Sequence, residues 1–219
     1  MDWELVRTSL GPIVRGAVLG TIPLTLASFA LGLALALAVA LMRLSHIRVV
    51  SGLARAYISV IRGTPLLVQL FVIFYGLPSV GLTISPWPSA IIAFSMNVGG
   101  YGAEIIRAAI LSVPKGQWEA AHMVGMPRAL ALRRIILPQA ARVSVPPLSN
   151  TFISLVKDTS LASLILVTEL FREAQQIAAV SQEFMVLYVE AAAVYWVVCL
   201  FLSTAQSLLE RRLDRYVAH

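Results

Sequence analysis

The sequence is poor in charged residues and in cysteine. Charged residues make up 13% of its 219 residues, compared with about 25% in an average soluble domain. The single cysteine, Cys199, excludes an intrachain disulfide and with it a small disulfide-stabilised scaffold. Hydrophobic residues account for 58% of the chain, and the mean hydropathy is +0.83. A domain of this size cannot hide so much apolar side chain from water, so a soluble globular enzyme is excluded. A disordered chain is excluded because disordered segments have low hydrophobicity.

Long stretches without charge predict helices that cross a membrane. Residues 16–42 and 63–103 carry no charged side chain, and one crossing needs about 20 apolar residues. Glycines and prolines between residues 76 and 88 are typical of a turn and divide the second stretch into two helices. We therefore expect an all-α integral membrane protein, a single domain over residues 1–219, with five spans. The expected spans cover about residues 16–42, 53–75, 88–111, 136–159 and 184–209, with a loop at 112–135 and a short amphipathic helix within 160–183.

The basic residues indicate how the chain sits in the membrane. A net charge of +6 alone would suit a nucleic-acid partner, but the basic residues lie between the apolar stretches. With five crossings, 13 of the 17 Lys and Arg residues fall on one side of the membrane. The other side holds Arg7, Arg15, Lys157 and Arg172. Because cytoplasmic loops carry the excess of Lys and Arg, we expect the N-terminus outside, the C-terminus in the cytoplasm, and no nucleic-acid partner.

The longest expected cytoplasmic loop contains a regular pattern. Glu119, Ala120 and Ala121 are followed after three residues by Gly125, and an Ile-x-Leu-Pro sequence begins ten positions further on. Glycine can take the left-handed backbone that ends a helix, and Pro127 suits the first turn of the next one. The pattern therefore predicts two short helices joined at Gly125, with the two alanines offering a small-residue surface to another protein.

This pattern resembles the coupling-loop motif of permease subunits of ABC importers and matches that motif over 20 positions without departure. The resemblance continues through residues 62–69, 75–78 and 149–160, and covers nearly the whole chain. The combination is similar to the polar amino acid permease family, most of all to its cystine-type members.

The resemblance implies a type I ABC importer permease with five transmembrane helices and a cytoplasmic coupling helix, located in the bacterial cytoplasmic (inner) membrane. Glu119, Ala120, Ala121 and Gly125 would couple it to ATPase subunits. Further implied partners are an extracytoplasmic amino acid-binding protein and a second permease copy, identical or paralogous. The substrate would be a polar amino acid, cystine-like or otherwise non-basic. ATP and Mg²⁺ would bind the ATPase, because this chain has no Gly-x-x-x-x-Gly-Lys-Ser/Thr loop. The chain itself would be a transport subunit without a cofactor, and not an enzyme.

The fourth expected span holds the candidate substrate site. Pro146 and Pro147 remove two backbone donors and should break or kink the helix, and transporter sites favour broken helices. Beyond them, five polar side chains fall on adjacent stripes of one helical face: Asn150, Thr151, Ser154, Lys157 and Asp158. Lys157 could hold the carboxylate of an amino acid and Asp158 its ammonium group. Alternatively, Lys157 extends to the outer interface and Asp158 caps the following segment.

Thr151 bears on the choice of substrate. Arginine-type members of the family often carry an acidic residue at this position, where it can pair with a guanidinium. Threonine cannot neutralise that charge, so the residue favours a non-basic amino acid.

Three other polar residues within the spans have structural interpretations. Glu104 and Arg107 are three positions apart on one helix and should pair with each other. Asn97 should either form a hydrogen bond across helices or line the transport path, and we favour the structural role.

Two alternative functions are a lipid-modifying membrane enzyme and the membrane anchor of a respiratory complex. The first needs a cluster of reactive side chains at one depth, and the second usually needs histidines inside the spans. His46, His122 and His219 are dispersed and show no metal-ligand spacing, so we expect neither a metal site nor a catalytic residue. Co-purification of an ATPase would exclude both alternatives.

Overall fold

The protein is described by a computed structural model that covers residues 3–214, with side chains as far as Arg211. Arg215 and His219, which entered the charge and metal-spacing arguments, lie outside the described residues. Helices account for most of residues 3–214, and this part of the chain contains no β-strand. The all-α prediction is therefore confirmed.

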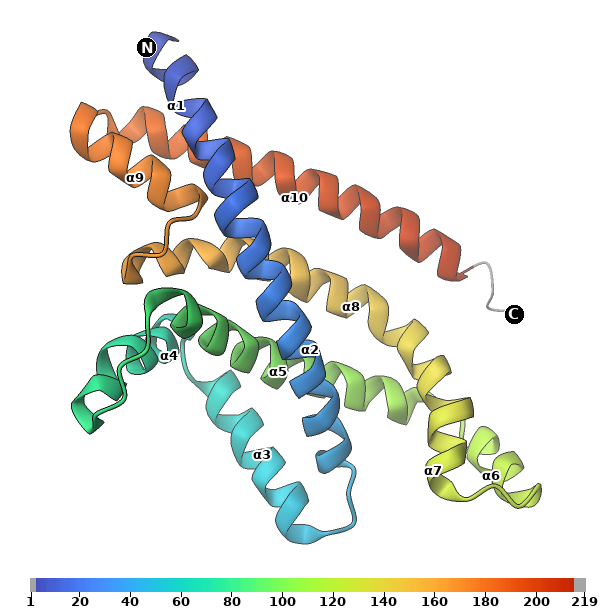
Figure 1. The fold of residues 1–219 in the computed structure, drawn as a ribbon. Helices are drawn as coiled ribbons and strands as arrows, with labels where there is room; N and C mark the ends of the chain where they lie inside the picture. The colour runs from blue at the N-terminus through green and yellow to red at the C-terminus, as the bar shows by residue number, and fades with distance from the viewer. Residues whose placement is uncertain (1–2, 215–219) are drawn as a thin grey trace.

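Ten α-helices within the described residues are linked by shorter helical segments (Figure 1). In chain order the segments are α1 (Trp3–Gly16), the π-helical η1 (Ala17–Thr21), α2 (Ile22–Arg43), α3 (Arg48–Gly63), α4 (Leu66–Phe71), η2 (Val72–Gly76), η3 (Leu77–Val80), α5 (Pro86–Ser112), α6 (Lys115–Met123), α7 (Arg128–Ala131), η4 (Leu132–Ile136), α8 (Leu137–Asp158), η5 (Thr159–Ile165), α9 (Leu170–Ser181) and α10 (Phe184–Asp214). The start of α1 lies at one end of the molecule, whereas α6, α7 and the end of α10 lie towards the other (Figure 1).

The length and hydropathy of the described helices support two to four membrane spans. Two helices qualify alone, Trp3–Arg43 and Phe184–Arg211, and two bent pairs qualify when each pair counts as one span. Helix α5 has 27 residues but is too polar to be among these candidates. It packs between α2, α3 and α8 and therefore does not depend on contact with lipid. The number five remains a prediction.

Two expected spans differ from the observed helices. The first begins at Trp3 and not near residue 16, because α1, η1 and α2 form one continuous helix of 41 residues. Its amphipathic start packs against α9 and α10, and this contact keeps it helical. The second, expected at 53–75, is divided into α3 and the helical stretch Leu66–Val80, which comprises α4, η2 and η3, and the two axes differ by 106°.

Small residues let α2 and α5 approach each other closely. These helices form the most extensive contact between any two elements of the described chain. A Cβ atom added at Gly32 of α2 would lie 2.6 Å from the Cβ of Val98 on α5. A Cβ atom added at Gly102 of α5 would lie 2.9 Å from the Cβ of Ala36 on α2. Lipid provides no hydrophobic force between helices, so close packing of this kind is what holds them together.

The short amphipathic helix expected within 160–183 is confirmed as α9, which buries Leu170, Ala174 and Ala178. Its N-cap is Glu169, a fully buried carboxylate. That carboxylate accepts hydrogen bonds from the backbone N–H groups of residues 171 and 172, at 3.0 and 2.7 Å. It also accepts one from the Tyr195 hydroxyl of α10, at 2.7 Å. These bonds fix α9 against α10.

We expect Gly32→Ala to destabilise the protein by about 1–3 kcal/mol, because the added methyl group overpacks a tight contact. Gly11→Ala is the matched control, since nothing lies within 4 Å of a Cβ atom at Gly11. In the control, alanine should be neutral or stabilise the helix by up to about 1 kcal/mol. The measurement is the thermal unfolding midpoint of each purified variant in detergent. Equal midpoints for the two variants would contradict the close-packing interpretation.

Candidate functional site

A cavity of about 510 Å³ lies where α3, α4, α5 and α8 meet. Its walls come from the junction of α3 and α4, from one face of α5 and from the second half of α8. Among the polar side chains that line it are Arg62, Asn97, Glu104, Thr151, Ser154 and Asp158. Arg62 and Tyr101 are both exposed at its rim, so the cavity opens at the surface of this chain.

The first wall exists because the chain breaks between α3 and α4. Thr64 precedes Pro65, and a residue before proline avoids the helical conformation. Thr64 is accordingly extended, with φ −121° and ψ 146°. The break turns the chain by 106° and brings both residues to the cavity, next to Arg62.

Gln69 satisfies the backbone acceptors that this break leaves free. Its side-chain amide donates to the carbonyl oxygen of Ile61 at 2.8 Å and to the carbonyl oxygen of Thr64 at 3.1 Å. It also lies 2.9 Å from the Thr64 hydroxyl. At membrane depth no lipid group can replace these donors, and irregular backbone is tolerated only where protein or a wet cavity covers it.

The α5 wall carries Asn97, Tyr101 and Glu104 at helical spacing on one face. The Arg62 guanidinium lies over the Tyr101 ring, with its central carbon 5.3 Å from the ring centre. Arg107 donates to the Glu104 carboxylate, with a shortest distance of 2.8 Å. The predicted Glu104–Arg107 pair is therefore present. Glu104 also lines the cavity, whereas the sequence analysis gave it a structural role only.

The α8 wall contains four of the five predicted site residues: Asn150, Thr151, Ser154 and Asp158. The Asn150 amide oxygen accepts a hydrogen bond from Gln206 of α10 at 3.0 Å. The Thr151 hydroxyl donates to the carbonyl oxygen of Pro147 at 2.9 Å. One side of α8 thus holds these residues together, as the helical spacing predicts.

Lys157 does not reach this cavity. It lines a separate cavity of about 490 Å³ between α8 and α10, with Tyr188, Tyr195, Trp196 and Cys199 among its neighbours. Lys157 is two turns beyond Asn150, on the edge of this face nearest α10, where Asn150 also accepts a hydrogen bond from Gln206. Asp158 is two turns beyond Thr151 and lines the cavity next to α5. The expected pairing of the Lys157 and Asp158 charges on one substrate is not supported by this arrangement.

The expected break at Pro146 and Pro147 is wrong. Helix α8 runs from Leu137 to Asp158 without interruption. The fixed φ angle of proline is compatible with a helix. The two prolines remove the hydrogen bonds to the carbonyls of Arg142 and Val143 and crowd those carbonyls, but they do not end the helix. The broken helix is the one that contains Thr64 and Pro65.

Sequence reasoning assigned no site role to Arg62, Tyr101 or Glu104, and for Asn97 it favoured a structural role over the alternative of lining the transport path; Asn97 does line the cavity. The sequence could have identified them because they are polar residues near or within long apolar stretches, and ionisable residues inside a membrane usually have a functional role. Only the packing of α3 and α8 on opposite sides of the cavity shows that these four side chains lie close together.

The coupling loop forms the two short helices expected around Gly125, α6 and α7. Gly125 has a φ angle of +75°, the left-handed conformation predicted for it. Its N–H donates to the carbonyl oxygen of His122 at 2.9 Å, and the next N–H donates to that of Ala121 at 3.0 Å. This is the hydrogen-bond pattern with which glycine commonly ends a helix.

The two alanines expected at the surface of this loop differ in exposure. Ala121 is buried, with 2% of its surface exposed, and packs inside the chain. Ala120 is exposed, as are Met123 and Val124, at 84% and 74%. A partner approaching the loop would therefore meet Ala120 and these two apolar side chains.

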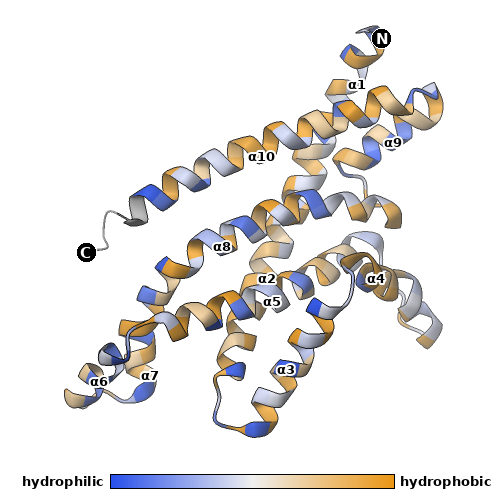
Figure 2. Cartoon of the chain, turned by 180° about the vertical axis from the view of Figure 1, so that it is seen from behind, coloured by the Kyte–Doolittle hydropathy of each residue, from blue (hydrophilic) through white to orange (hydrophobic). Residues whose placement is uncertain are grey.

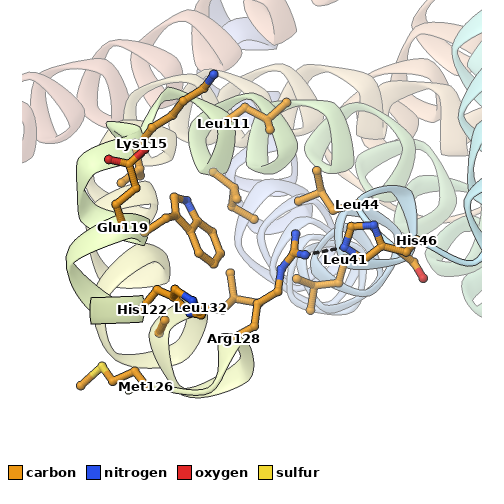
Figure 3. A pocket seen from close by; sticks show the side chains of 15 residues that line it. Leu41, Leu44, His46, Leu111, Lys115, Glu119, His122, Met126, Arg128 and Leu132 are labelled. Atoms are coloured by element: carbon orange, nitrogen blue, oxygen red, sulfur yellow. Dashed lines mark hydrogen bonds between the residues drawn. The ribbon is translucent and has the colours of Figure 1, made fainter. Parts of the chain in front are cut away.

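A cavity of about 850 Å³ lies between the coupling loop and the ends of α2 and α5, and Glu119 is part of its lining (Figure 3). Arg128 of α7 points into it and contacts the ring of His46 (Figure 3). The Arg128 guanidinium also lies 5.8 Å from the centre of the Trp118 ring. These contacts tie the α2–α3 turn to the coupling loop.

We expect Gln69→Leu to lower the stability of the protein by about 1–3 kcal/mol, because the partly buried carbonyl group of Ile61 and the carbonyl group of Thr64 lose their donor. Gln69→Glu tests the same point differently, since a carboxylate provides no N–H donor when ionised. Gln176→Leu, at an exposed position on α9, is the control and should change little. Thermal unfolding of the purified variants measures the effect. An unchanged midpoint for Gln69→Leu would show that the break does not need this cap.

Comparisons with known proteins agree with the fold and with the motif. Residues 28–215 match the family described as "Binding-protein-dependent transport system inner membrane component". The chain is 59% identical to the L-cystine transport system permease protein TcyB of Bacillus subtilis (strain 168), over 100% of this chain and 94% of that protein. It is 40% identical to the nopaline transport system permease protein NocM of Agrobacterium fabrum, over 96% of this chain and 91% of that protein.

Solved structures show the same architecture. A crystal structure of an amino acid ABC transporter with histidines has a TM-score of 0.91 and 38% identity, over 97% of this chain and 99% of that chain. An inward-facing structure of the MetNI methionine ABC transporter has a TM-score of 0.77 at 19% identity, over 92% of this chain and 96% of that one, and shows a shared fold alone. Neither the lipid-modifying enzyme nor the respiratory anchor finds support in these relatives. The chain belongs to the family of binding-protein-dependent transport system inner membrane components, and it is a membrane-embedded permease subunit and not an enzyme.

Proposed function

We propose that this permease moves a polar amino acid of zero net charge, of the cystine type, into the cell. The observation that carries the proposal is the cavity at the α3–α4 break, which holds Arg62 and Asp158 together with the hydroxyl groups of Thr151 and Ser154. An amino acid presents a carboxylate, which needs a cation, and an ammonium group, which needs an acceptor. Arg62 takes the role that the sequence assigned to Lys157, and Asp158 keeps its role.

The charge balance of the cavity favours a net-neutral substrate. Arg62 and Asp158 supply one charge of each sign. The other carboxylate of the lining, Glu104, is already paired with Arg107. A cationic amino acid would need an additional unpaired carboxylate, and Thr151 does not supply one. The 59% identity to a cystine permease supports the same substrate class.

The proposed mechanism needs three partners besides the substrate. A second permease copy, identical or paralogous, covers the open side of the cavity. An extracytoplasmic binding protein delivers the amino acid to the pair of permeases. Two ATPase subunits bind ATP and Mg²⁺ and dock at residues 119–125, and ATP hydrolysis drives the change from outward-open to inward-open.

The proposed orientation follows from the distribution of basic residues, with the N-terminus outside and the C-terminus in the cytoplasm of a bacterium. It puts α6 and α7 on the cytoplasmic side, where the ATPase subunits are. It also puts the turn between α2 and α3 on that side, next to the coupling loop that His46 contacts.

We expect Arg62→Gln and Asp158→Asn each to weaken the apparent affinity for cystine about ten- to a hundredfold, because each loses one charge-assisted contact worth about 1.5–3 kcal/mol. The measurement is uptake of labelled cystine, glutamine and arginine by the complex reconstituted in liposomes with its ATPase and binding protein. Lys157→Met tests the earlier assignment and should change this affinity less than Arg62→Gln does.

Arg15→Gln is the control for loss of a positive charge, since Arg15 is exposed and does not line the cavity. If Lys157→Met abolishes affinity while Arg62→Gln preserves it, the carboxylate is held in the cavity between α8 and α10. If every variant prefers arginine to cystine, the proposed substrate class is wrong.

We expect Gly125→Val to abolish substrate-stimulated ATPase activity while the permease still inserts and folds, because a β-branched residue is strained at a φ of +75°. Gly125→Asn is the matched control, since asparagine tolerates the left-handed conformation. Stimulated ATPase of the reconstituted complex measures the effect. Equal activity in the two variants would show that coupling does not depend on this turn.

A further inference from the structure

Helix α3 has three faces of different character. One face packs against α2 and α5 and buries Ser51, Ala54, Ile58 and Ile61. A second face is exposed and apolar, and consists of Val49, Leu53, Ala56 and Val60. Figure 2 shows hydrophilic residues recurring along α3, whereas α10 is hydrophobic over most of its length before its C-terminal part.

The third face, called here the arginine face, lies between the other two. It consists of Arg48, Gly52, Arg55, Ser59 and Arg62. The three arginines are seven positions apart, which places them almost directly above one another after each two turns, about 10 Å apart along the helix. All three are exposed, and no other atom lies within 4 Å of a Cβ built at Gly52.

The contacts of α3 fix the depth of this face. At one end, the Ser51 hydroxyl donates to the carbonyl oxygen of Arg43, where α2 ends. At the other end, the Tyr57 hydroxyl donates to the carbonyl oxygen of Met96 at 2.6 Å, near the middle of α5. The arginine face therefore runs from the end of the spanning helix α2 to the middle of the bundle, where Arg62 enters the candidate substrate cavity.

Arginines at this depth cannot be left facing acyl chains. Charged residues within spans almost always face the interior of a bundle or a water-filled path, and often mark the route of an ion or substrate. Within the described side chains, none of these three arginines forms an ion pair. The neighbouring apolar face is the exposed surface of α3 that suits lipid, and the arginine face is the one that suits water.

We propose that the arginine face of α3 lines an aqueous passage that joins the substrate cavity to the cytoplasm and attracts carboxylate-bearing substrates along it. The proposal rests on the proposed function, and it adds the exit route and the residues that line it. Arg62 holds the carboxylate in the cavity, Arg55 receives it about two turns lower, and Arg48 lies at the mouth. A charged cleft with low-dielectric walls raises the local concentration of anions. On a net-neutral amino acid the arginines act locally, through charge-assisted contacts with its carboxylate group.

The test measures water access and charge preference, and does not depend on which substrate the complex transports. In a Cys199→Ser background, a single cysteine replaces Ser59, which lies between Arg55 and Arg62 on the arginine face. The matched control replaces Ala56, which is exposed on the apolar face of the same helix. Inside-out membrane vesicles containing the permease–ATPase complex are treated with an anionic or a cationic methanethiosulfonate, and the labelling rates are normalised to those of free cysteine.

We expect S59C to react and A56C to remain nearly unlabelled, because lipid covers the apolar face. After normalisation the anionic reagent should react faster at S59C, and adding Arg55→Gln should reduce this preference by about tenfold, the lower limit for electrostatic focusing in a cleft. Retention of the ATPase subunit on purification establishes that each variant is assembled.

Three results would overturn the proposal. If S59C is as inert as A56C, the arginine face is covered by lipid or by another protein and lines no passage. If S59C reacts without preferring the anionic reagent, the passage does not attract anions. If the preference persists in the double variant Arg48→Gln/Arg55→Gln, the arginine face does not cause it. A failure of cystine uptake with normal S59C labelling would instead refute the proposed substrate and leave the passage supported.

Discussion

The close contact between α2 and α5 is the constraint on which the positions of the other helices depend. Gly32 and Gly102 allow these helices to touch along much of their length, because a side chain at either position would collide with the other helix. Helix α5 is thereby held in the centre, with α3 and α8 also packed against it. Since lipid does not drive helices together, this packing replaces the hydrophobic effect that would organise a soluble core. It also allows α5 to be polar, because its neighbours shield it from lipid.

The broken helix between α3 and α4 shows how backbone chemistry limits where a transport site can form. An open carbonyl at membrane depth needs a donor from the protein, and Gln69 supplies one to Ile61 and to Thr64. With those groups satisfied, the break can face a cavity and expose Thr64 and Arg62 to it. The two prolines of α8 make no such opening, because their φ angles fit the helix and the chain continues through them.

The intramembrane charges are distributed among separate environments. Glu104 and Arg107 neutralise each other on one helix, whereas Asp158 and Arg62 approach the same cavity from opposite walls. Lys157 lies between α8 and α10 in aromatic surroundings. One carboxylate, Glu169, is fully buried and accepts four hydrogen bonds, which join the first helix, α9 and α10. Its role is structural, whereas Arg62 and Asp158 are the charges that we propose to contact the substrate.

The sequence predicted the helical class, the amphipathic helix α9 and the two helices around Gly125. These features depend on local chemistry, namely long apolar stretches, the spacing of apolar residues and the left-handed conformation that glycine adopts easily. Helical spacing predicted that five polar residues of α8 share one face. Four of them share a cavity, and the fifth, Lys157, lines the cavity next to α10. The family was evident from the same residues, since its motif lies in one continuous loop.

Tertiary structure decided which side chains meet across the cavity. Arg62 and Asp158 are 96 positions apart, and only the packing of α3 and α8 around α5 brings them to one cavity. Helical geometry sets the side of α8 on which Lys157 lies. The packing of α10 against that side decides which residues surround Lys157. Likewise, proline identifies points where a helix loses a hydrogen bond, but the groups that surround it determine whether the helix breaks there. Thr64 and Pro65 have Gln69 as a substitute donor beside an open cavity, and so the chain turns at that point.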